Sequence, residues 1–104
     1  MIEIAKELFN SGKIILPNKV IVADSIDSNS STTKNIDSVS GSDKIFDINL
    51  TSNMSEILKN SKTILWNGPI GVFEKEPFQK GTHQLAKTIA GSKAFSLAGG
   101  GETI

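Results

Sequence analysis

The chain has 104 residues, enough for one modest domain with a single core. Its 11 basic and 11 acidic side chains cancel, so no overall field attracts nucleic acid or an anionic membrane surface. The lack of cysteine excludes a disulfide scaffold or a thiolate metal site, and no apolar run approaches the roughly 20 residues that cross a bilayer. We therefore expect a soluble, cytoplasmic domain without nucleic-acid or membrane partners.

Short apolar patterns divide the first half of the chain into a helix and strands. Apolar residues recur at helical spacing in 2–10, and the β-branched runs 13–16 and 19–23 are typical of strands separated by a turn at Pro17. Residues 25–42 are rich in serine and threonine and poor in apolar groups. This composition predicts a polar, solvent-exposed and flexible excursion.

The second half alternates strands and helices. Strands are expected at 44–48, 63–66 and 94–98, and helices at 52–60 and 81–91. The last two strands are apolar enough to be buried on both faces, and Asn53 and Glu56 have the spacing of a capping box. The alternation predicts an open parallel α/β sheet, in which ligands bind beyond the carboxyl ends of the strands. Both glycine-rich segments, 67–71 and 99–101, follow strands there.

The glycine triplet suits a phosphate. Gly99, Gly100 and Gly101 let the backbone approach an anion at a helix N-terminus, where Thr103 offers a hydroxyl and Glu102 a ligand for Mg²⁺. The alternative is a tight turn in which the same Glu and Thr cap and charge the helix. On these residues alone the tight turn is favoured.

The segment after the strand at 63–66 allows two interpretations. Asn67 can bond a phosphate or hydroxyl, Pro69 stiffens the turn, Gly71 leaves room for a flat ring, and Glu74 can accept hydrogen bonds from ribose hydroxyls. Alternatively the segment is a two-turn connection in which Val72 and Phe73 fill the core and Glu74 is solvated. Residue types and spacing leave both open.

Two further residue types are assigned to the framework rather than to chemistry. Trp66 is expected in the core rather than as a stacking platform. Asp24 and Asp47 end strands and could serve the site or cap turns, and the structural role is favoured. The chain has no nucleophile–base pair, no zinc-ligand spacing and no complete P-loop. It also lacks a G-x-G-x-x-G run opening a helix, which disfavours a dinucleotide-dependent oxidoreductase.

Four segments together resemble phosphoglycerate kinases. LWNGPIGVFEKEPFQKGT (65–82) is similar to the family's WNGP-x-GVFE-x-x-x-F-x-x-GT signature, and SLAGGGETI (96–104) to its GGG-[DE]-[ST] loop. ILPNKVIVAD (15–24) resembles a pair of family strands, and IFDI (45–48) the segment before a nucleotide-contacting loop. The resemblance implies that residues 1–104 are part of the carboxy-terminal, nucleotide-binding domain. The implied fold is a Rossmann-like, open, mostly parallel sheet with flanking helices, incomplete because it is part of one domain.

The resemblance also implies an activity and its residues. Phosphoglycerate kinases move a phosphoryl group reversibly between 1,3-bisphosphoglycerate and ADP, giving 3-phosphoglycerate and ATP in glycolysis. The implied nucleotide contacts are Phe46, Asn67, Pro69, Gly71, Val72, Glu74, Gly99, Gly100, Gly101 and Thr103. Asn67 would face the phosphates and Glu74 the ribose, Gly100 and Gly101 would be catalytic beside the transferring phosphoryl, and Glu102 would hold Mg²⁺.

Much of the family's chain has no counterpart in this sequence. The amino-terminal domain that holds phosphoglycerate and the lysines that open the nucleotide domain are absent, so we expect a fragment of a monomeric parent that is inactive by itself. Asn49 and Leu50 stand where the family has Gly-Pro. The alternative is a stand-alone, non-catalytic nucleotide-binding or interaction module. Exposed sheet edges would favour marginal stability or self-association in either case.

Overall fold

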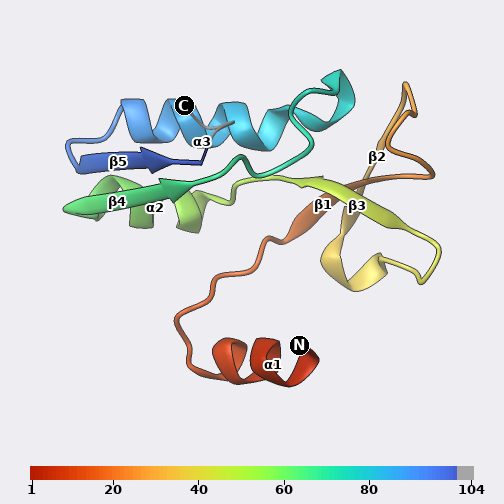
Figure 1. Ribbon diagram of the computed structural model, residues 1–104, viewed down its shortest axis with the longest axis horizontal. Coiled ribbons are helices and arrows are strands. Elements are labelled where there is room, and N and C mark those ends of the chain that lie inside the picture. The colour runs from red at the N-terminus through yellow and green to blue at the C-terminus, as the bar shows by residue number, and fades with distance from the viewer. Residues whose placement is uncertain (101–104) are drawn as a thin grey trace.

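The structure, a computed structural model, describes residues 1–100. The elements in chain order are α1 (Ile2–Asn10), β1 (Lys19–Ala23), β2 (Thr32–Asn35), the 3-10 helix η1 (Ile36–Ser38), β3 (Lys44–Ile48), α2 (Ser52–Asn60), β4 (Thr63–Asn67), the 3-10 helix η2 (Glu76–Phe78), α3 (Lys80–Ala90) and β5 (Phe95–Gly99). Strands β2-β1-β3 form one sheet and β4-β5 another (Figure 1). The α/β class with helices and a parallel sheet is confirmed. None of the helices in the described residues is long and apolar enough to cross a membrane.

The sheet arrangement differs in part from the sequence-based expectation. Among the strands of residues 1–100, only β4 and β5 pair in parallel, whereas β1 pairs antiparallel with both β2 and β3. Parallel strands need a long crossover, and the segment that contains α3 provides one between β4 and β5. The link from β1 to β2 is shorter and carries no α-helix, so β2 returns antiparallel to β1. Strand β3 pairs antiparallel with the other edge of β1.

The polar excursion at 25–42 is more ordered than expected. It remains largely exposed, as predicted, but it contains β2 and η1. Strand β2 pairs with β1 from Thr32 opposite Val22 to Asn35 opposite Lys19. Asp43, just after the excursion, holds its second half in place. The Asp43 Oδ2 atom accepts hydrogen bonds from Lys34 Nζ in β2 and from the Ser40 N–H, both at 2.8 Å. The bond from Lys34, followed by that from Ser40, holds the pKa of the Asp43 carboxyl below its usual value.

The strand expected at 13–16 is absent. These residues follow α1 as an extended link, and Ile14, Ile15 and Leu16 are exposed. A strand requires a partner for its backbone, and none of the described strands pairs with this segment. Helix α1 itself forms as predicted, stands apart from the sheets (Figure 1) and buries none of its residues.

Strand β4 buries one face only. Ile64 is 6% exposed, whereas its neighbour Leu65 is 74% exposed. Leu65 and Leu97 are opposite each other in the β4–β5 register, so they share a face, and Phe95 belongs to it as well. Since these three side chains are exposed, the expectation that both strands are buried on both faces is wrong. The buried apolar residues are instead Val20, Ile21, Val22, Ile64 and Phe78.

The cap of α2 lies one position before the helix. Thr51 Oγ1 accepts a hydrogen bond from the Met54 N–H at 3.1 Å, so Thr51 is the N-cap. The predicted capping pair of Asn53 and Glu56 is therefore wrong, because Asn53 already lies inside the helix. The helix itself occupies the predicted residues 52–60.

Replacing Thr51 with Ala should lower the free energy of unfolding by about 1 kcal/mol, since the Met54 N–H loses its acceptor. Urea denaturation measures the change. Asn53→Ala is the control, and it should leave stability equal or slightly higher because Ala is the better helix former. An equal loss in both variants would contradict the assignment of Thr51 as the cap.

Candidate functional site

The two glycine-rich segments begin side by side. Strands β4 and β5 run in the same direction (Figure 1), and their last residues, Asn67 and Gly99, are register partners. The Asn67 Oδ1 atom lies 3.5 Å from the position that a Cβ on Gly99 would occupy. The exposed amide of Asn67 therefore lies against the backbone of Gly99. Gly100 follows with a φ of 84°, a conformation that favours glycine.

The segment after β4, here called the motif loop (residues 67–74), starts with a tight turn. Gly68 has a φ of 96°, which a side chain would strain. The half-buried Trp66 donates its indole N–H to the Gly68 carbonyl oxygen at 2.7 Å. Trp66 thus fixes the turn with its N–H group while part of its ring is buried.

A β-bulge places Phe46 beside the motif loop. In the β1–β3 register Ile21 is opposite Asp47 and Val22 is opposite Ile45, which leaves Phe46 as the extra residue. The Phe46 carbonyl oxygen accepts the Val72 N–H at 3.0 Å. The Phe46 ring also contacts the fully buried ring of Phe78, with centroids 4.9 Å apart. The structure therefore brings together Phe46 and Val72, two of the residues predicted for one wall.

Asp47 lies at the junction of β3, the motif loop and α3. It is 2% exposed, and its Oδ2 accepts the Gly81 N–H at 2.9 Å in the first turn of α3. A Cβ at Gly71 would lie 2.5 Å from Asp47 Oδ1 and 2.7 Å from the Phe78 carbonyl oxygen. A Cβ at Gly81 would collide with the same Oδ1. Both glycines are required by packing around one carboxyl group, and the predicted structural role of Asp47 is confirmed.

Sequence reasoning missed the partners of Asp47. The available signals were a single acidic residue inside the strand pattern KIFDI and a helix start, Gln79-Lys80, that lacks a capping side chain. Asp47 supplies the missing cap from another element, and a carboxylate is favourable at a helix N-terminus. Burial raises the pKa of Asp47, and the hydrogen bonds from the Gly81 and Ile48 backbone only partly oppose this shift.

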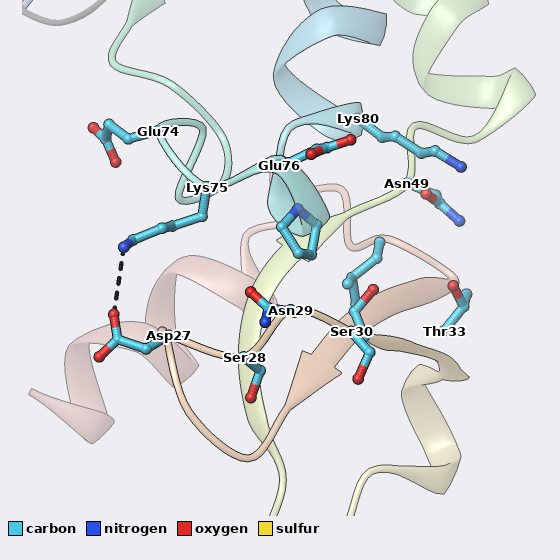
Figure 2. A pocket seen from close by; sticks show the side chains of 13 residues that line it. Asp27, Ser28, Asn29, Ser30, Thr33, Asn49, Glu74, Lys75, Glu76 and Lys80 are labelled. Carbon is cyan, nitrogen blue, oxygen red and sulfur yellow. Dashed lines mark hydrogen bonds and ion pairs between the residues drawn. The ribbon is translucent and has the colours of Figure 1, made fainter.

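Glu74 borders a different part of the surface from the other described candidate residues. It is exposed and borders a polar hollow of about 740 Å³ between the serine-rich segment after β1 and the residues around η2. Figure 2 shows its carboxylate turned away from the serines, while Lys75 reaches Asp27 across the hollow at 3.3 Å. Among residues 1–100, none of the other residues predicted to contact nucleotide lines this hollow.

Three of the predicted residues, Gly101, Glu102 and Thr103, lie outside the described residues, so the predicted metal ligand and phosphate hydroxyl have no structural description. Within residues 1–100 no group of three or more His, Cys, Asp or Glu side chains is placed to hold a metal ion.

The whole length of the chain is similar to proteins of one known family. The family model described as "Phosphoglycerate kinase" matches residues 1–104. Curated phosphoglycerate kinases from Baumannia cicadellinicola and Vibrio campbellii are 46% and 43% identical and match all of this chain. The chain spans only 27% and 28% of their respective lengths.

Solved structures of the same family are also similar to this chain in fold and sequence. The phosphoglycerate kinase of Coxiella burnetii matches 97% of this chain with a TM-score of 0.84 and 40% identity, and that of Pyrococcus horikoshii matches 98% with a TM-score of 0.77 and 32% identity. This chain covers 28% and 26% of those two proteins.

The raised pKa of Asp47 predicts a specific pH dependence. Between its ordinary value of 3.8 and its higher folded value, the folded chain binds more protons than the unfolded chain. The stability linked to Asp47 is therefore fully present below 3.8 and is lost as the pH rises through the folded pKa. Relative to Asp47→Asn, the wild-type melting temperature should fall as the pH rises from about 4 through the folded pKa of Asp47.

Thermal melts of both proteins across this range measure the effect. The comparison cancels the opposite contribution of Asp43, which both proteins share and whose pKa is lowered in the folded chain. Asp24→Asn, at an exposed carboxylate just after β1, is the matched control and should follow the wild type. A constant difference between wild type and Asp47→Asn would contradict the raised pKa.

Proposed function

The chain belongs to the phosphoglycerate kinase family, and we propose that it forms part of the nucleotide-binding half of such a kinase. The parent protein would transfer a phosphoryl group reversibly between 1,3-bisphosphoglycerate and ADP in the cytoplasm. The remainder of the parent, about three quarters of the length of the matched relatives, would contribute the phosphoglycerate site. By itself the chain would bind adenine nucleotide without turnover.

The observation that carries this proposal is the register pair of Asn67 and Gly99. In parallel α/β sheets, ligands bind beyond the carboxyl ends of the strands, and both family motifs leave the parallel pair at that edge. Asn67 would donate its amide N–H to a nucleotide phosphate. The backbone of Gly99, Gly100 and Gly101 would approach the transferring phosphoryl group, and Thr103 would donate its hydroxyl to a phosphate oxygen.

The remaining contacts divide between base and ribose. Phe46, Pro69 and Val72 are half-buried, and the bond from Val72 to the Phe46 carbonyl joins two of them into one surface that suits the flat, apolar faces of adenine. Gly71 would complete this wall, and Glu74 would accept hydrogen bonds from the ribose hydroxyls.

These residues would contribute to catalysis by positioning the reacting groups. Phosphoryl transfer needs aligned groups and neutralised charge more than covalent participation by the protein. Backbone N–H groups at glycines and an uncharged amide can orient phosphates without competing for the metal. Mg²⁺ would neutralise the phosphates, with Glu102 as its protein ligand, where most family members have Asp.

Titration of Mg-ADP into the purified chain, followed by calorimetry, tests the proposal. Glu74→Gln should weaken binding at least about tenfold, because bonds to a charged acceptor are replaced by weaker ones. Glu76→Gln is the matched control, since Glu76 is an exposed acid on the same hollow, and it should bind as the wild type does.

A coupled phosphoglycerate assay on the same preparation should give no turnover above background. Failure of the wild-type chain to bind Mg-ADP would overturn its assignment as a working nucleotide site. Equal losses in Glu74→Gln and Glu76→Gln would indicate an effect of general charge and would contradict the assigned ribose contact.

A further inference from the structure

The first turn of α3 holds the motif loop by its backbone. Thr82 Oγ1 accepts hydrogen bonds from two successive amides, the Ile70 N–H at 3.2 Å and the Gly71 N–H at 3.4 Å. Thr82 is half-buried. It lies 12 residues after Ile70 and 11 after Gly71, so these bonds join two segments that are separate in sequence. Neither residue composition nor helix periodicity assigns a role to this hydroxyl.

Asp47 contacts the same turn of α3. Its Oδ2 accepts the Gly81 N–H, the amide directly before Thr82, and its Oδ1 lies against Gly71. The contacts at Gly71 and Gly81 leave no room for even one methyl group. Strand β3, the motif loop and α3 therefore meet with little freedom to move relative to one another.

Three consecutive amides of the loop are satisfied in this way. Ile70 and Gly71 donate to Thr82, and Val72 donates to the carbonyl of Phe46, which directly precedes Asp47. These bonds set the backbone of the segment that would form the adenosine wall. A loop already held in one shape loses less conformational entropy when a ligand binds.

We propose that Thr82 and Asp47 are positioning residues for the nucleotide site, acting by holding residues 70–72 in a shape that receives adenosine. This inference rests on the proposed function, because it assigns the nucleotide as the ligand of that loop. Neither side chain needs to touch the nucleotide. Thr82 orders the loop through its backbone amides, and Asp47 holds the helix turn from which Thr82 acts.

The test compares three threonine variants at a temperature well below melting. Thr82→Val keeps the shape of the side chain but removes the acceptor, and it should weaken Mg-ADP binding about tenfold. Thr82→Ser keeps the hydroxyl and should stay within about twofold of the wild type. Thr88→Val is the matched control in the same helix, where the hydroxyl bonds only the Gln84 carbonyl of its own helix. It should bind as the wild type does.

Amide hydrogen exchange supplies a readout that a merely stabilising residue would not move. In the nucleotide-free wild type the Ile70 and Gly71 amides should be protected, and Thr82→Val should expose these two amides while those of β4 stay protected. Unprotected amides in the wild type would overturn the inference even if Thr82→Val does not fold.

The two proposals fail in different ways. Wild-type affinity in Thr82→Val, together with faster exchange at Ile70 and Gly71, would overturn the positioning role and leave the nucleotide site intact. Absence of Mg-ADP binding by the wild type would overturn the proposed function and, with it, this inference.

Discussion

The packing of the site depends on one buried carboxyl group. Asp47 gives up its hydration, which is costly, and recovers only part of that cost from the Gly81 N–H and from the favourable field at the start of α3. Its second oxygen has no polar partner within the described residues. Because the Cβ positions of Gly71 and Gly81 both fall against this oxygen, one Cα hydrogen of each glycine faces it, which is a weak interaction at best.

The contacts of Asp47 explain why two positions ten residues apart are both glycine. Gly71 and Gly81 lie in different elements, yet both are glycines because the same carboxyl group leaves no space for a side chain. The bulge at Phe46 adds a residue to β3 and turns a carbonyl toward Val72 instead of toward β1. Residues that the family resemblance assigns to nucleotide binding are thus held by residues to which it assigns no role.

Much of this arrangement could be predicted from local patterns, and the rest depends on tertiary contacts. The helices at 2–10 and 52–60 and the strands at 19–23 and 44–48 follow from periodicity and β-branched content, which are properties of the segments themselves. The run at 13–16 has the same content but no partner strand. For the site, the meeting of the two strand ends followed from parallel pairing, whereas the bonds of Asp47 and Thr82 join segments that no spacing rule connects.

The uncovered face of β4 and β5 has a thermodynamic consequence. Leu65, Phe95 and Leu97 are 74%, 64% and 51% exposed in the folded chain, so each adds less to the heat capacity of unfolding than a buried side chain of its size would. For the same reason they add less to the denaturant dependence of the free energy of unfolding. A chain with this surface has a flatter stability curve than its length alone would suggest.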